Sequence, residues 1–141
     1  MSDKEKRRVL FLCTHNSARS QMAEGILRNL YGDKFEVFSA GTEPSRVNPY
    51  AMGAMQEIGI DISENTSKSI EGFQEMNIDY VVTVCDHAKE SCPTFPGAKH
   101  NIHKGFIDPS KFGGKDKEIL LGFIQIRDEI RSWIQKEFEN I

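Results

Sequence analysis

The chain has 141 residues and a mass of 16.0 kDa, a size that suits one domain with a single hydrophobic core. Its 18 basic and 21 acidic residues give a net charge of -3, which excludes a broadly basic surface for nucleic acid or an anionic membrane. After a charged start, the apolar run Val9–Cys13 is too short for a signal peptide or a membrane span. We therefore expect a single domain over residues 1–141 that works in the cytoplasm, with neither nucleic acid nor a membrane as partner.

The first predicted elements are a strand, a helix and a second strand. The continuous apolar run Val9–Leu12 is typical of a strand buried on both faces of a parallel sheet. Apolar residues at helical spacing then predict a helix that ends before Gly32; they are Met22, Ala23, Ile26, Leu27 and Leu30. A weaker strand over Phe35–Ala40 stops at Gly41.

The same alternation continues to the end of the chain. Asn48 and Pro49 form the cap and first turn of a second helix, whose apolar residues are Met52, Met55 and Ile58. A third strand covers Tyr80–Val84, and the polar run Ala98–His103 predicts a fourth strand at an edge of the sheet. The last helix carries an apolar stripe one face wide, which consists of Ile119, Phe123, Ile126, Ile130, Trp133 or Ile134, and Phe138. This order indicates a doubly wound α/β domain, in which ligands bind beyond the carboxyl ends of the strands.

A C-x5-R motif lies between the first strand and the first helix. It starts at Cys13, ends at Arg19, is followed by Ser20, and encloses Thr14, His15, Asn16, Ser17 and Ala18. In this position the backbone N–H groups of the loop can turn inward and add to the positive end of the helix dipole, which creates a site for a tetrahedral oxyanion. Arg19 then binds two oxygens of the anion, while the loop dipoles and the Ser20 hydroxyl favour the thiolate of Cys13. We expect Asn16 to brace the loop, and a buried structural cysteine is the alternative for Cys13.

Two further cysteines, Cys85 and Cys92, follow the third strand. The segment between them predicts a short helix that begins at Asp86 and ends before Pro93. On an intact helix the two cysteines would lie roughly 10 Å apart, beyond the limit of roughly 7 Å on the Cα separation of a disulfide. A disulfide therefore requires the segment to unwind, which would present a thiol to a reductant.

An odd count of three cysteines in a cytosolic chain indicates reactive or metal-binding thiols rather than a disulfide framework. A zinc site would recruit His87, His100 and His103, but the C-x6-C spacing is wider than zinc sites usually have. Two unrelated core cysteines are another alternative. We favour a relay of electrons between the thiols, with no bound metal.

Asp108 is the candidate general acid. It precedes Pro109 in a predicted loop and follows the apolar residues Phe106 and Ile107. Partial burial beside these side chains would favour the protonated form that a general acid needs. The alternative is a simple Asp-Pro turn with no chemical role.

Taken together, these motifs resemble the thioredoxin-coupled arsenate reductases. The resemblance extends from about Arg8 to the last helix and rests on the segment Cys13–Gly25, on Cys85 and Cys92, and on Asp108. It implies the low-molecular-weight protein tyrosine phosphatase fold, a three-layer αβα arrangement around a four-stranded parallel sheet. Related phosphatases share only the first loop, so the cysteine pair argues for redox chemistry over ester hydrolysis.

The resemblance implies a thiol relay with arsenate as substrate and with phosphate or sulfate as competing oxyanions. Cys13 attacks arsenic while the loop and Arg19 bind the oxyanion, and Asp108 protonates the leaving oxygen. Cys85 then attacks Cys13, which releases arsenite, and Cys92 resolves the resulting disulfide. External thioredoxin reduces the final disulfide, so no tightly bound cofactor is expected.

The resemblance also bears on potassium. Asn16, Ser39 and Thr66 match positions that carry a potassium ion in some members of the family. Lys68 replaces a carboxylate that helps there, and its ammonium can take the place of the cation. This replacement argues against potassium dependence.

Two other functions stay open at this point. A phosphotyrosine or small-molecule phosphatase would need only Cys13, Arg19 and Asp108. A non-enzymatic redox or oxyanion sensor would use a disulfide to switch a binding surface. Arsenate-dependent oxidation of NADPH through thioredoxin distinguishes the reductase from both.

Overall fold

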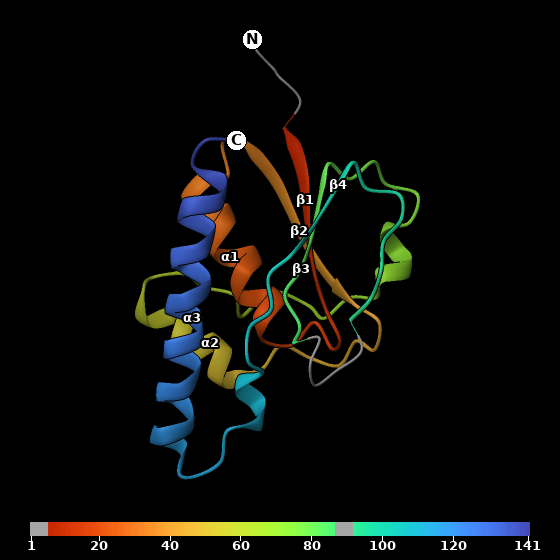
Figure 1. Ribbon diagram of the computed structural model, residues 1–141. Helices are drawn as coiled ribbons and strands as arrows, with labels where there is room; N and C mark the ends of the chain where they lie inside the picture. Colours follow the sequence, from red (N-terminus) through yellow and green to blue (C-terminus); the bar gives the residue numbers. More distant parts are fainter. Residues whose placement is uncertain (1–5, 87–91) are drawn as a thin grey trace.

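Four parallel strands form one sheet. The structure is a computed structural model in which residues 6–86 and 92–141 are described. The strands lie in the order β2-β1-β3-β4 (Figure 1), and they are β1 (Arg7–Cys13), β2 (Phe35–Gly41), β3 (Tyr80–Thr83) and β4 (His100–His103). Every neighbouring pair is parallel. The four predicted strands are confirmed, and the polar strand β4 lies at an edge as expected.

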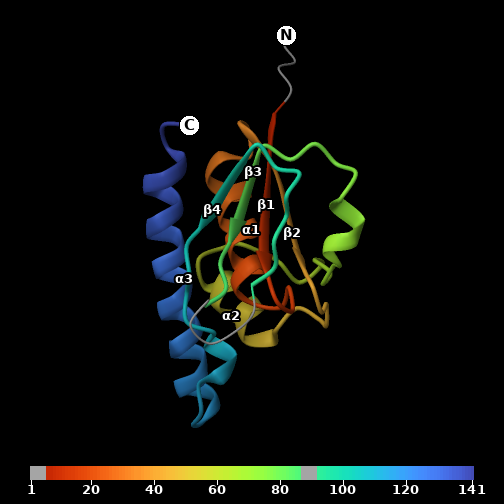
Figure 2. The ribbon, with the colours of Figure 1, turned by 45° about the vertical axis from the view of Figure 1, so that its right-hand side comes forward.

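The α-helices of the described chain cover one face of this sheet (Figures 1 and 2). They are α1 (Arg19–Tyr31), α2 (Pro49–Glu57) and α3 (Asp116–Phe138), and α3 packs against the other two. The buried side chains of α3 are Phe123, Ile126, Arg127, Ile130, Ile134 and Phe138. The predicted stripe therefore faces the core, with Ile134 fully buried and Trp133 only partly buried. None of the helices in the described part of the chain is long and apolar enough to cross a membrane.

The opposite face of the sheet has a thinner cover. It consists of the short 3-10 helix η1 (Ile70–Phe73) and the chain around Phe95, as the right-hand side of Figure 2 shows for η1. Because successive side chains of a strand point to opposite faces, Val9 and Phe11 pack on the helix side and the leucines between and after them pack here. The core on this face is small and consists of Leu10, Leu12, Ala40, Phe73, Ile78, Val81 and Phe95. β1 is thus buried on both faces, which its apolar run predicted.

The element boundaries define the surroundings of the C-x5-R motif. β1 ends at Cys13 and α1 begins at Arg19, so the motif is a loop between a buried strand and a helix. A second 3-10 helix, η2 (Pro109–Lys111), begins directly after Asp108 and was not predicted. The short helix expected over residues 86–92 lies largely outside the described residues.

Replacement of Phe123 by alanine tests the packing of α3. The Phe123 ring is 0% exposed, and loss of such a ring costs about 3–5 kcal/mol of unfolding free energy. Leu121 on the same helix is 56% exposed, so Leu121→Ala should change the unfolding free energy by less than about 0.5 kcal/mol. Urea unfolding followed by circular dichroism measures both values. Equal losses in the two variants would contradict the assigned buried face.

Candidate active site

The loop between β1 and α1 is held against the chain that follows β2. The backbone N–H of Glu43 donates to the carbonyl of Thr14 at 2.8 Å. The N–H of Asn48 donates to the carbonyl of Ser17 at 2.9 Å. Gly41 allows this close approach, because a Cβ at that position would lie 2.5 Å from the Thr14 oxygen. The shape of the loop therefore depends on a glycine at the end of another strand.

Asn16 connects the loop to α1 and to the segment that precedes η1. Its backbone has a φ of 49°, in the left-handed region that asparagine tolerates better than most residues. Its side-chain N–H donates to Ser20 Oγ at 2.8 Å. Its side-chain oxygen accepts from the backbone N–H of Lys68 at 2.8 Å and from Gln21 Nε2 at 3.0 Å. These bonds give Asn16 the bracing position that the sequence predicts for it.

Cys13 forms no disulfide and lies where the loop starts. Its sulfur is 2.9 Å from Ser20 Oγ. Ser20 has one hydroxyl hydrogen and already accepts a hydrogen bond from Asn16, so that hydrogen can point to the sulfur. A donor in this position stabilises a thiolate, which is the nucleophilic form of cysteine.

A cavity of about 80 Å³ opens over Cys13. Its lining consists of Cys13, His15, Ser17, Ala18, Arg19, Ser45, Asp108 and Ser110. The volume is far below the roughly 300–1,000 Å³ of pockets for drug-sized ligands, so it suits a small anion. Sequence reasoning missed Ser45 and Ser110, because a lone serine in a loop carries no pattern. Of the predicted loop residues, Asn16 and Ser20 are fully buried behind the lining.

His15 lies at the rim of this cavity. Its side chain is exposed, and Nδ1 lies 3.0 Å from the carbonyl oxygen of Glu43. Its own carbonyl accepts a hydrogen bond from Ser67 Oγ at 2.8 Å. His15 therefore fits the loop by contacts with both neighbouring segments.

Arg19 and Asp108 meet at the cavity although they are far apart in sequence. Arg19 is buried, and its Nη2 lies 3.5 Å from Asp108 Oδ2. Its Nη1 donates to the carbonyl of Phe106 at 3.2 Å. Asp108 also caps η2, so the turn expected as its alternative role exists and leaves the carboxylate in the cavity. The structure thus places the predicted acid beside the predicted anion ligand.

The cysteine pair lies at the same end of the sheet as Cys13, beyond the carboxyl ends of the parallel strands. β1 and β3 are parallel neighbours, and the N–H of Val84 donates to the carbonyl of Leu12 at 2.9 Å, one residue before each cysteine. Cys85 and Cys92 form a disulfide with their Cα atoms 5.9 Å apart. This separation lies within the roughly 7 Å limit on the Cα separation of a disulfide.

The disulfide also bears on the alternatives for these cysteines. A bonded pair is not two unrelated core cysteines, although Cys85 is fully buried. Cys92 is partly exposed. Within residues 6–86 and 92–141, no group of three or more His, Cys, Asp or Glu side chains is placed to hold a metal ion. His87, one member of the zinc alternative, lies outside the described residues.

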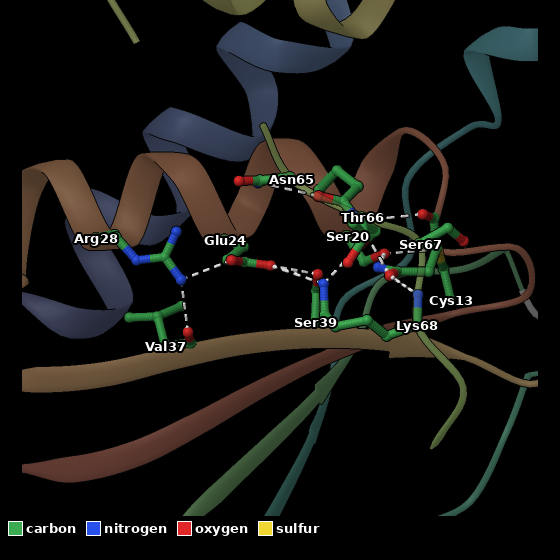
Figure 3. A network of polar contacts seen from close by, with 12 residues as sticks. Cys13, Ser20, Glu24, Arg28, Val37, Ser39, Asn65, Thr66, Ser67 and Lys68 are labelled. Carbon is green, nitrogen blue, oxygen red and sulfur yellow. Dashed lines mark hydrogen bonds and ion pairs between the residues drawn. The ribbon is translucent and has the colours of Figure 1, made fainter. Parts of the chain in front are cut away.

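The ammonium of Lys68 lies among the residues to which the potassium resemblance points (Figure 3). Its Nζ donates to the carbonyl of Thr66 at 2.7 Å and lies 3.9 Å from Glu24 Oε1. The Ser39 hydroxyl donates to the same carboxylate oxygen. Burial lowers the pKa of Lys68, while Glu24 opposes this shift and Arg28 adds to it. A cationic side chain of the protein therefore faces this buried carboxylate.

Glu24 is the member of this network that sequence reasoning missed. It is buried in α1, and its second carboxylate oxygen lies 2.5 Å from Arg28 Nη2. Ser20, Glu24 and Arg28 are four residues apart, so one face of α1 aligns them, as Figure 3 shows. This spacing is the signal that would have found Glu24. Asn16 links Ser20 to the backbone of Lys68, and so to the charged cluster of Glu24, Arg28 and Lys68.

The fold and the site together define a class of protein. The sequence pattern of the low molecular weight phosphotyrosine protein phosphatases matches residues 8–140, and the chain belongs to this family. Relatives of the chain within this family carry a more specific name. The chain is 50% identical to the arsenate reductase of Halalkalibacterium halodurans over 125 residues, which are 89% of this chain and 90% of that protein. It is 45% identical to the arsenate reductase of Bacillus subtilis over 134 residues, which are 95% and 96% of the two chains.

Solved structures give the same result. An arsenate reductase in the reduced state matches with a TM-score of 0.75 at 34% identity, over 92% of this chain and 95% of that one. The thioredoxin-dependent arsenate reductase of Corynebacterium glutamicum matches with a TM-score of 0.65 at 30% identity, over 93% of this chain and 61% of that one. The resemblance to arsenate reductases and the fold that it implies are confirmed.

Ser20→Ala tests the donor to Cys13. In the disulfide form Cys13 is the only free thiol among the three cysteines, so its reaction with iodoacetamide can be followed alone. A hydrogen bond to a charged group contributes about 1.5–3 kcal/mol, so we expect alkylation at pH 7 to slow by about tenfold or more. Ser63→Ala, whose hydroxyl bonds to Asp61 on the surface, is the control. An unchanged rate in Ser20→Ala would show that this bond does not stabilise the thiolate.

Proposed function

We propose that this chain is an arsenate reductase that converts arsenate to arsenite through Cys13, Cys85 and Cys92, with thioredoxin as external reductant. One observation carries the proposal. A disulfide between Cys85 and Cys92 lies at the carboxyl end of the sheet, where Cys13 lines a cavity of oxyanion size. Relatives at 45% and 50% identity that are named arsenate reductases support the same reaction.

Arsenate binding uses the loop N–H groups and the Arg19 guanidinium. The net charge of -3 gives the chain no general attraction for an anion, so these local donors must supply it. Phosphate and sulfate share the tetrahedral shape and compete for the same donors. The Cys13 thiolate attacks arsenic, and Asp108 protonates the oxygen that leaves as water.

The next steps move two electrons from sulfur to arsenic. The Cys85 thiolate attacks the Cys13 sulfur; an S–S bond forms, the S–As bond breaks, and its electron pair stays on arsenic, which leaves as arsenite. The Cys92 thiolate then attacks Cys85 and releases Cys13 as a thiolate. The product of this exchange is the Cys85–Cys92 disulfide that the structure contains.

Burial decides which sulfur a reductant can reach. Cys85 is 0% exposed, whereas Cys92 is partly exposed. An incoming thiolate therefore attacks Cys92 and expels Cys85. The structural neighbour from Corynebacterium glutamicum is named thioredoxin-dependent, which supports thioredoxin as the reductant. A relay that needs reduced thiols in every cycle suits the cytoplasm.

Arsenate-dependent oxidation of NADPH, with thioredoxin and thioredoxin reductase, tests the reaction. We expect oxidation by the wild-type protein and its loss in Cys85→Ser, because arsenic cannot be reduced without the second thiol. Hydrolysis of an aryl phosphate that survives this substitution, with no arsenate-dependent oxidation, would make the chain a phosphatase. Absence of both activities would favour the sensor.

Cys92→Ser, in the same assay, separates arsenite release from the final exchange. We expect about one arsenite per protein and a Cys13–Cys85 disulfide in a non-reducing peptide map, since nothing resolves that bond. Cys13→Ser should release no arsenite. Sustained turnover by Cys92→Ser with thioredoxin would refute the relay.

Potassium is not expected to bind, because Lys68 already places a cation 3.9 Å from Glu24. Lys68→Asp removes the ammonium and adds a carboxylate, so KCl should raise the Tm of this variant by about 2–4 °C relative to choline chloride at equal ionic strength. The wild-type Tm should not respond. Lys99→Asp, which changes a 73% exposed side chain, controls for the added charge. An equal response of the wild-type protein would contradict the replacement of potassium by Lys68.

A further inference from the structure

We propose that Ser110 is a positioning residue for the acid step: it holds one oxygen of the Asp108 carboxyl, so that only the other oxygen can carry the proton to the leaving group. The inference rests on the proposed function, because it concerns how Asp108 acts there. Ser110 belongs to no motif of the sequence, yet it lines the cavity together with Cys13 and Arg19.

Two donors of Ser110 engage the same oxygen of Asp108. The backbone N–H of Ser110 donates to Oδ1 at 2.9 Å, and its hydroxyl donates to Oδ1 at 2.7 Å. Pro109, which is buried, separates the two residues and fixes the backbone of the first turn of η2. With two donors on Oδ1, a proton on that oxygen would displace one of them. The carboxyl therefore carries an acidic proton on Oδ2.

Oδ2 faces Arg19 rather than Ser110. Arg19 Nη2 lies 3.5 Å from Oδ2, and both residues line the cavity. A bound oxyanion competes for the same guanidinium and adds negative charge beside Oδ2. Substrate binding therefore favours protonation of the oxygen that must deliver the proton.

A pH study must distinguish the effect of Asp108 from the effects of the other charged groups near it. Cys13 and His15 line the same cavity as Asp108, and Lys111 lies on the same 3-10 helix. The reaction needs Cys13 as the thiolate and Asp108 as the protonated acid, so both groups bear on the pH dependence of the rate. His15→Asn removes the imidazole from the cavity lining and is combined with each variant.

The experiment is a pH series of single turnovers. Reduced protein is mixed with arsenate without thioredoxin, and arsenite is quantified after rapid quenching between pH 6 and 9. Asp108→Asn shows whether the acid step controls the rate, and we expect it to be strongly slowed. Ser110→Ala loses the hydroxyl donor but keeps the N–H, so we expect a rate about three- to tenfold lower. Loss of a donor to the carboxylate favours its protonated form, so the rate deficit of this variant should shrink as the pH rises.

Ser110→Thr is the matched rescue. It keeps a hydroxyl at the same atom, so its rate and pH profile should return toward those of the wild-type protein. Ser110 is exposed, and a Tm within the range of surface substitutions confirms that Ser110→Ala folds. A rate in Ser110→Ala that equals wild type, or that falls equally at every pH, would overturn the inference, and so would an unaffected Asp108→Asn. No arsenite from the wild-type protein would instead refute the proposed function itself.

Discussion

The side-chain amide of Asn16 is the contact on which the site depends. It is buried beneath the loop and bonds to Ser20 on one side and to the backbone of Lys68 on the other. Because the amide donates to Ser20, the serine hydroxyl is left with one hydrogen to direct at Cys13. The same amide fixes the backbone that carries the Lys68 ammonium to Glu24. The Cys13 thiol, the path of the loop and the charged cluster of Glu24, Arg28 and Lys68 therefore share one support.

The charged side chains near the site are paired with oppositely charged side chains within the fold. An unpaired buried charge is costly, and one partner close by removes much of that cost. The Arg19 guanidinium, which is the cation available to an oxyanion, faces Asp108. The Glu24 carboxylate faces Arg28 and Lys68. Both carboxylates therefore lie beside a cationic side chain of the fold.

The redox chemistry is an addition to a phosphatase scaffold. The family fold supplies the loop that begins at Cys13, and Arg19 and Asp108 line the cavity over that loop. The parallel pairing of β1 with β3 brings the ends of both strands together, so that Cys13 at the end of β1 and Cys85 just after β3 lie on neighbouring strands. Cys92 then completes a disulfide on the same edge. Function therefore depends on three thiols at the carboxyl ends of the strands rather than on the fold alone.

The sequence by itself determined the strands, the long helix and the place of the C-x5-R loop between a strand and a helix, because apolar periodicity and residue type are local properties of the chain. It did not show that the α-helices share one face of the sheet. The apolar run of β1 indicates that both faces are buried, but it does not say which elements cover each face. The tertiary structure alone brought Arg19 to the chain near Phe106, 87 residues away, and Ser110 into the cavity. It also placed Glu24 opposite Lys68. Such contacts arise when distant segments pack, and no spacing within one segment encodes them.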